Sequence, residues 1–230
     1  MNRRNIMIGG AVLAVGAAFG AYALVPGARR KATAPESAGG AAPKAIALPP
    51  RVPGLRVVDG DRILGAPDAP ITIIEYSSLT CPHCAAFHRE ALPQIKKEWI
   101  DKGKVRLVYR HFPLDGLGLR AAAVANCIEG ERYFAFINVL FENQQRWARA
   151  DDPVKTLGQY ATLAGLSQKR FKACVTDQAE MDRIVAGAKR ARESYKVEST
   201  PTLFIDGHKF PGARPFSAYE AIFQAIAAQT

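Results

Sequence analysis

A run of β-branched and apolar residues that leads into a cysteine pair constrains the fold of this chain more than any other feature. Residues 71–76 read Ile-Thr-Ile-Ile-Glu-Tyr, and prolines and an aspartate precede them. Such a run predicts a strand that is buried on both faces. Cys81-Pro82-His83-Cys84 follows, and apolar residues then recur at helical spacing as far as Trp99. We therefore expect the cysteine pair where a buried strand ends and a helix begins.

The remaining sequence predicts an α/β domain in two halves that are separated by helices. Val105–Tyr109 has the composition of a second strand, so a βαβ half opens the domain. From Pro113 to Tyr195 no strand pattern is visible, and helix-starting and helix-ending residues recur. Strands return at Thr202–Ile205 and after the turn-forming Asp206-Gly207, and a last amphipathic helix follows at 217–228. We therefore predict a βαβ half, an all-helical insertion at about 114–196 with four or five helices, and a ββα half.

The N-terminal residues 1–31 have the features of an export segment. Residues 6–25 are apolar and carry no charge, and Arg3 and Arg4 precede them. This apolar run is long enough to span a bilayer as a helix. A signal peptide, cleaved after Ala21-Tyr22-Ala23, and an uncleaved membrane anchor both fit this pattern. Residues 32–56 are rich in Ala, Pro and Gly and predict a linker, and 57–230 form the predicted folded domain. We expect the domain outside the cytoplasm, in the periplasm, where disulfides persist.

The net charge argues against a nucleic-acid partner. The formal net charge is +10, but five cationic residues precede the first acidic residue, Glu36. The rest of the chain therefore carries only half of the net positive charge. Its lysines and arginines are scattered over predicted helix surfaces and do not form a stripe with aromatic residues. The domain is thus expected to be mildly basic without being a polyanion binder.

The placement of the cysteine pair predicts redox chemistry. A sulfur at a helix N-terminus lies near unpaired N–H groups and the positive end of the helix dipole, so Cys81 is expected to be an accessible, acidic thiol with Cys84 as its covered partner. Pro82 fits the first helical turn, and the His83 imidazole can stabilise a thiolate. A structural disulfide, half of a zinc site and copper delivery are the alternatives. They are weaker because the other two cysteines form no second C-x-x-C and no methionine adjoins the motif.

Two segments resemble the DsbA-like branch of the thioredoxin superfamily. They are 74–84, which ends in the Cys-Pro-His-Cys motif, and 199–207, which reads Ser-Thr-Pro-Thr-Leu-Phe-Ile-Asp-Gly, and the resemblance covers about residues 57–230. It implies a thioredoxin-like fold with a helical insertion. It also implies that Pro201 is a cis-proline facing the cysteines and that the Thr200 backbone pairs with an extended substrate, whereas an ordinary strand start is the alternative. No metal, flavin or nucleotide cofactor is implied.

Other residues near the motif are given roles by the same resemblance or by their setting. Glu75 is a charged residue in an apolar strand, and the resemblance implies that it lies beneath the cysteines and relays a proton for Cys84; a glutamate that reaches solvent is the alternative. His88 is expected to be a helix-surface residue. Cys127 and Cys174 each lie among apolar residues, and we expect them to form a structural disulfide rather than two buried thiols.

These features together predict a dithiol oxidase. The expected function is to introduce disulfide bonds into reduced exported polypeptides by exchange at Cys81–Cys84, followed by reoxidation by a membrane quinone-linked partner of DsbB type. Residues 6–25 would tether the protein to the inner membrane if they are not removed. The threonine before the proline is typical of isomerases and weaker oxidases in the family, so a disulfide isomerase or reductase stays open. A membrane-tethered binding or chaperone module with structural cysteines is the other alternative.

Overall fold

The computed structural model describes residues 46–229. The predicted export segment, with the apolar stretch at 6–25, lies outside these residues, as does most of the predicted linker. Within the described part of the chain, no helix combines the length and the hydropathy needed to cross a membrane.

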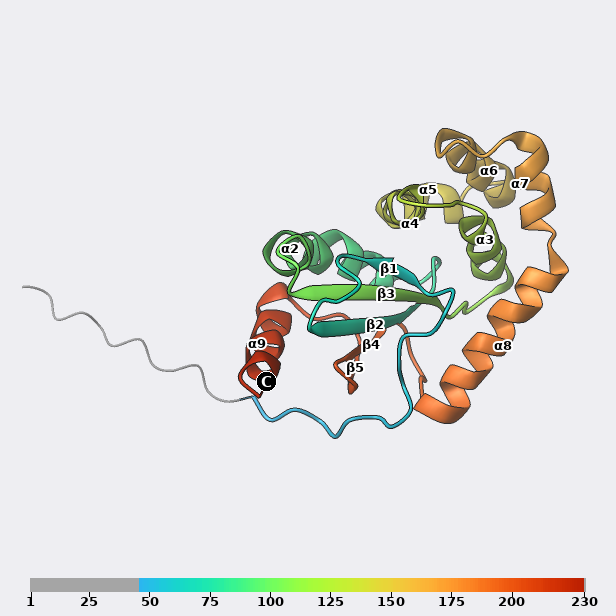
Figure 1. Cartoon of the computed structure of the whole chain (residues 1–230). Coiled ribbons are helices and arrows are strands. Elements are labelled where there is room, and N and C mark those ends of the chain that lie inside the picture. Colours follow the sequence, from blue (N-terminus) through green and yellow to red (C-terminus); the bar gives the residue numbers. More distant parts are fainter. Residues whose placement is uncertain (1–45, 230) are drawn as a thin grey trace, which may run out of the picture. The chain divides into compact units, whose positions relative to one another are not determined.

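A five-stranded mixed sheet lies at the centre of the described residues (Figure 1). Its order is β1-β3-β2-β4-β5, with β2 and β3 parallel and the other neighbours antiparallel. The strands are β1 (Arg62–Leu64), β2 (Ile71–Ser77), β3 (Val105–His111), β4 (Thr202–Ile205) and β5 (His208–Pro211). The predicted thioredoxin-like α/β fold is therefore confirmed. The short edge strand β1 was not predicted, because its three residues carry no alternating pattern long enough to detect.

Strand β2 is buried on both faces, as its composition predicts. Ile71 and Ile73 belong to the larger hydrophobic core, whereas Ile74 and Tyr76 belong to a second core on the opposite face of the sheet. Glu75 lies on the same face of the strand as Ile71 and Ile73, toward the larger core, and it has no exposed surface. The buried strand therefore carries one carboxylate into the interior.

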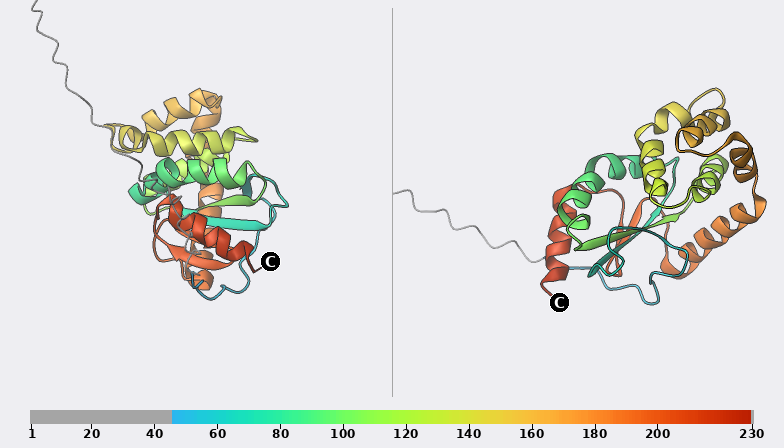
Figure 2. Two further views of the ribbon diagram at one scale, coloured as in Figure 1. Left: turned by 90° about the vertical axis from the view of Figure 1, so that its left-hand side faces the viewer. Right: turned by 45° about the horizontal axis from the view of Figure 1, so that its top comes forward.

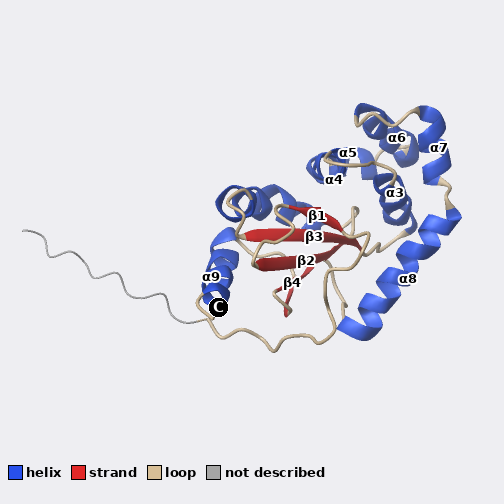
Figure 3. Cartoon of the chain, viewed as in Figure 1, coloured by secondary structure: helices blue, strands red, loops and turns tan. Residues whose placement is uncertain are grey.

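A continuous helical segment follows β2 and covers one face of the sheet (Figure 3). It comprises α1 (Pro82–Ala86), the π-helical turn η1 (Phe87–Ala91), α2 (Leu92–Ile95) and a second π-helical turn η2 (Lys96–Ile100). Pro93 has no N–H to donate to the carbonyl of Arg89, and this missing bond accounts for the widened turn before it. On the same face lies the C-terminal helix α9 (Phe216–Ala227), whose Tyr219 and Phe223 are buried in the core.

Six helices between β3 and β4 form the insertion, within the residues that the structure describes. Figures 1 and 2 show α3 to α7 gathered beside the sheet, and the long α8 running back to it. The sequence predicted four or five, and the extra helix is the single turn α5, which follows α4 with no linker. The helices are α3 (Gly116–Asn126), α4 (Arg132–Glu142), α5 (Gln144–Ala148), α6 (Pro153–Leu163), α7 (Gln168–Val175) and α8 (Gln178–Tyr195).

The end of the predicted linker packs on the second face of the sheet. Val52 and Leu55 contact the core that contains Ile74 and Phe204, and the end of α8 covers the same core. Arg51 also pairs with His208 as an isolated β-bridge. Residues from about 48 onward are thus part of the folded domain, which the sequence had placed from 57, because apolar side chains after Ala47 have a hydrophobic surface to cover.

Candidate active site

Cys81 and Cys84 lie where β2 passes into α1. Cys81 is the N-cap of α1 in an extended conformation, Pro82 occupies the first helical turn, and the Cys84 backbone N–H donates to Cys81 Sγ over 3.4 Å. Both cysteines are free thiols in this structure. Cys81 exposes 4% of its surface and Cys84 none, so Cys81 is the outer of the two but is more covered than the sequence predicted.

The two thiols have opposite acidities. The hydrogen bond from the Cys84 thiol, together with contacts to Thr200 and to the N–H groups of Cys84 and His83, lowers the pKa of Cys81 to about 5, although burial opposes this. Burial raises the pKa of Cys84 far above its usual value, and the proximity of Cys81 and of the Glu75 charge raises it further. The reduced pair therefore holds one thiolate and one thiol near neutral pH.

His83 contributes to this site through its backbone. Its N–H group faces the Cys81 sulfur, whereas its side chain is exposed, as is that of Pro82. The N–H groups of the helix N-terminus thus help to lower the pKa of Cys81, after the partner thiol and Thr200.

The segment before β4 covers the outer cysteine. The Thr200–Pro201 peptide bond is cis, and the Cys81 thiol donates to the Thr200 carbonyl oxygen over 3.3 Å. Both Thr200 and Pro201 are buried. Thr200, which is 119 positions from Cys81 along the chain, thus lies against the sulfur. This contact explains why Cys81 is more covered than it would be at a helix N-terminus alone.

Gln144 supports the loop of the outer cysteine from the helical insertion, and no pattern in the sequence indicated this role. Its side-chain amide is buried and donates to the carbonyl oxygens of Leu79, at 2.8 Å, and of Cys81, at 3.0 Å. The Cys81 carbonyl also accepts the Ala85 N–H of the first helical turn, whereas Gln144 is the partner of the Leu79 carbonyl, which precedes the helix. The insertion therefore helps to hold the redox motif in place.

Glu75 lies in the interior with a histidine as its partner. His88 Nε2 is 3.1 Å from each Glu75 carboxylate oxygen, and the His88 side chain is 1% exposed. The prediction that His88 is a helix-surface residue is therefore wrong. His88 lies four residues after Cys84, on the same helix face as Phe87 and Leu92, and that spacing could have revealed its burial.

Unpaired polar atoms gather around the cysteines. Within residues 46–229, only four buried side-chain oxygen or nitrogen atoms have no hydrogen-bond partner, and three are the hydroxyls of Ser77, Tyr109 and Thr200. Ser77 and Tyr109 are neighbours of Cys84, and Thr200 is a neighbour of Cys81. Buried polar groups are normally paired, so this concentration is typical of a functional site.

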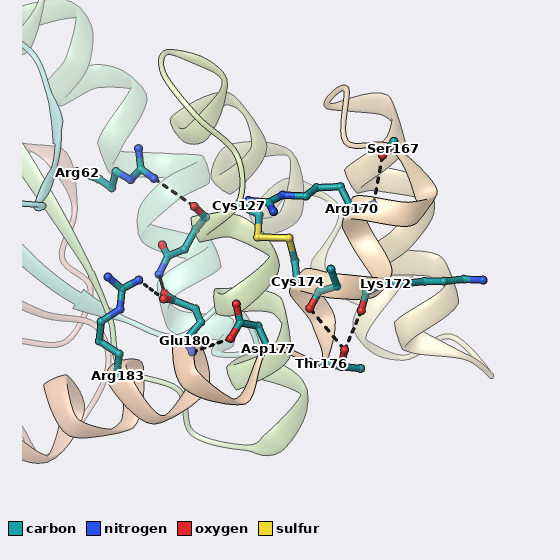
Figure 4. The surroundings of a disulfide bond; sticks show 12 residues. Arg62, Cys127, Ser167, Arg170, Lys172, Cys174, Thr176, Asp177, Glu180 and Arg183 are labelled. Carbon is teal, nitrogen blue, oxygen red and sulfur yellow. Dashed lines mark hydrogen bonds and ion pairs between the residues drawn. A yellow bond between two sulfur atoms is a disulfide. The ribbon is translucent and has the colours of Figure 1, made fainter.

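Cys127 and Cys174 are joined by a disulfide in the helical insertion (Figure 4). Cys127 follows the last turn of α3 and Cys174 lies on α7. The bond therefore connects these two helices through cysteines that are 47 residues apart in sequence. The adjacent Asn126 donates to Glu180 on α8 over 2.6 Å. The disulfide connects α3 with α7, and this hydrogen bond connects α3 with α8. Among the described residues, no group of three or more His, Cys, Asp or Glu residues is placed to hold a metal ion.

Comparison with known proteins relates most of the chain to disulfide-forming proteins. Residues 58–225 match the family described as thioredoxin. A protein of Rickettsia felis named protein-disulfide oxidoreductase is 30% identical over 154 residues, which cover 66% of this chain and 55% of that protein. This chain thus spans little more than half the length of that relative. Disulfide bond formation protein D of Bacillus subtilis is 25% identical over 186 residues, covering 76% of this chain and 79% of that protein.

A solved structure gives the same relationship at the level of the fold. Alpha-DsbA1 of Wolbachia pipientis superimposes with a TM-score of 0.70 and is 34% identical. The alignment covers 76% of this chain and 98% of that structure.

Proposed function

This chain belongs to the DsbA-like branch of the thioredoxin family, and on that basis we propose that it is a protein thiol:disulfide oxidoreductase that forms disulfide bonds in exported polypeptides. The observation that carries the proposal is the contrast in acidity between the two thiols at the N-terminus of α1. A thiol with a low pKa is a good leaving group, so a disulfide that contains it is readily given up to a substrate.

The reaction begins with Cys81 and Cys84 as a disulfide. A substrate thiolate attacks Cys81 Sγ, the Cys81–Cys84 bond breaks, and Cys84 leaves as a thiolate that takes up a proton because its pKa is raised. A second substrate thiolate then attacks the substrate sulfur of the mixed disulfide, and Cys81 leaves as a stable thiolate. The substrate loses two electrons, which the enzyme holds as the reduced pair.

Thr200 and Pro201 provide the place where a substrate would bind. They cover Cys81, and the Thr200 carbonyl already accepts a hydrogen bond from that thiol. An extended substrate segment that pairs with this backbone would bring its own sulfur to Cys81 of the disulfide. Glu75 and His83 complete the proposed catalytic set, and Cys127–Cys174 has a structural role.

The cellular setting follows from the N-terminal sequence. We propose that residues 1–31 direct export, that the domain from about 48 to 230 acts in the periplasm, and that a membrane quinone-linked protein of DsbB type restores the disulfide. Whether residues 6–25 are cleaved decides between a free and a tethered enzyme.

Oxidation of a peptide with two thiols tests the proposed activity. The oxidised protein should convert one equivalent of peptide, and Cys81→Ala should convert none while it keeps its fold. The double variant Cys127→Ala/Cys174→Ala is the matched control and should convert the peptide. Rapid alkylation in intact cells then separates oxidase from isomerase, because an oxidase is held as Cys81–Cys84 disulfide and an isomerase as free thiols. Equal activity of Cys81→Ala and the unchanged protein would refute the proposal.

A further inference from the structure

The buried Glu75–His88 pair has no place in the exchange steps described above, although it lies beneath the cysteines. Both side chains are almost completely removed from solvent. A buried carboxylate is costly unless it is paired, and His88 contributes the hydrogen-bond donor that Glu75 needs. The pair therefore holds a proton next to Cys84, whose thiol must lose one each time the disulfide forms.

The second nitrogen of the His88 ring points toward the surface. Nδ1 lies 3.3 Å from Asn138 Oδ1, and Asn138 is half-buried on α4. The imidazole thus has a carboxylate on one side and an amide at the edge of the protein on the other. A ring in this setting donates from both nitrogens, and it can release the Nδ1 proton to water at the surface and regain it there without moving.

Aromatic side chains hold the ring in that orientation. Phe141 stacks on it with ring centroids 4.1 Å apart, and Phe87 meets it edge-on at 5.4 Å. The titratable groups around the Glu75–His88 pair are Cys84 on α1, Tyr109 on β3, Tyr133 on α4 and Tyr219 on α9. Arg89, the next residue along the chain, donates to the Phe141 carbonyl.

We propose that His88 is the residue through which the proton of Cys84 passes between Glu75 and the protein surface at Asn138. This inference rests on the proposed function. His88 acts through Glu75 and is a positioning and proton-carrying residue, whereas Glu75 is the residue whose charge acts on Cys84.

The step it serves is closure of the Cys81–Cys84 disulfide. When a disulfide reoxidises the enzyme, Cys81 forms a mixed disulfide with it and one thiolate is released. Cys84 then attacks Cys81 Sγ, the bond to the oxidant sulfur breaks, and that sulfur leaves as a second thiolate with the electron pair. Glu75 takes up the Cys84 proton, and His88, which donates from both ring nitrogens in the resting pair, releases its Nδ1 proton to water beside Asn138, so the pair gains one proton and loses one. The products are two thiolates of the oxidant, the enzyme disulfide and the one proton that the reduced pair held. Both transfers run in reverse when Cys84 leaves as a thiolate in the next turnover.

Reoxidation by oxidised glutathione tests the role of His88, because its two steps can be timed separately by acid quench and mass spectrometry. His88→Gln keeps a donor for Glu75 but cannot gain or lose a proton. We expect its second step at pH 7 to be about 100-fold slower, the size of a typical acid–base contribution. Its glutathione adduct should accumulate, and its closure rate should rise with pH while that of the unchanged protein stays flat. The first step, attack by Cys81, should be the same in both.

His208→Gln is the matched control, since His208 is a buried histidine on β5 whose Nδ1 contacts Pro49. It should close at the unchanged rate. Asn138→Leu leaves the Glu75–His88 pair intact, removes the partner of Nδ1, and should slow closure by about 10-fold; it decides the question if His88→Gln does not fold. Equal closure rates and pH profiles for the unchanged protein and these site variants would overturn the role of His88 alone. Failure of the unchanged protein to form a Cys81 adduct would instead overturn the proposed function.

Discussion

Reduction of the Cys81–Cys84 disulfide should change the stability of the fold in a direction that depends on pH. The folded reduced protein has a Cys81 pKa of about 5, whereas an unfolded cysteine has about 8.5. A depressed folded pKa adds stability that is fully present above the unfolded pKa and is lost as pH falls through the folded pKa. At pH 7 this amounts to at most about 3 kcal/mol in favour of the folded reduced form.

The disulfide acts in the other direction by restricting the unfolded chain. Cys81 and Cys84 close a very short loop, and the chain-entropy relation gives it about 2 kcal/mol. Cys84 stays protonated in both states below pH 8 and adds nothing. The reduced form should therefore be more stable than the oxidised form by about 1 kcal/mol at pH 7 and less stable by about 2 kcal/mol at pH 4, with equality at roughly pH 6.

Urea unfolding of the two forms at several pH values measures this difference. Because a reductant would also break the second disulfide, both forms should be prepared from Cys127→Ala/Cys174→Ala. Thiolates absorb at roughly 240 nm and thiols do not, so the absorbance at this wavelength reports the Cys81 pKa in the same samples. A difference between the forms that stays constant from pH 4 to pH 8 would refute the reasoning.

Three further predictions concern other residues of the site and the insertion. Cys84→Ala should accumulate a mixed disulfide when it is incubated with oxidised glutathione, because the Cys81 thiolate attacks that disulfide, one glutathione thiolate leaves, and no Cys84 thiol remains to displace the other; mass spectrometry without adducts would contradict this. Loss of the Cys127–Cys174 bridge should lower the free energy of unfolding by about 2–4 kcal/mol and spare peptide oxidation, as measured by urea unfolding and turnover. Gln144→Leu leaves the buried Leu79 carbonyl without its partner and removes one of two bonds to the Cys81 carbonyl, so it should cost about 1–3 kcal/mol in the same unfolding assay, whereas the same change at the exposed Gln145 should cost nothing measurable.

Local sequence determined the parts of the fold that depend on short-range pattern. The strand at Ile71–Ser77 has a composition that only a doubly buried strand satisfies, and Asp152-Pro153 and Ser167 start helices because their side chains cap free N–H groups. The Cys81-Pro82-His83-Cys84 spacing likewise requires a helix N-terminus at the first cysteine. These features involve residues within a few positions of one another, so the sequence contains all the information they need.

Tertiary structure alone decided which distant groups meet at the cysteines. Thr200 covers Cys81 and Gln144 holds its loop, across separations of 119 and 63 residues. Glu75 acquires His88 as a partner because β2 and the helix that follows it face one another in the core, which turned an expected surface histidine into a buried one. The acidity of Cys81 and the burial of Cys84 arise from these contacts. Such properties depend on how the chain packs, and the identity of a residue does not specify the dielectric and the neighbours that packing will give it.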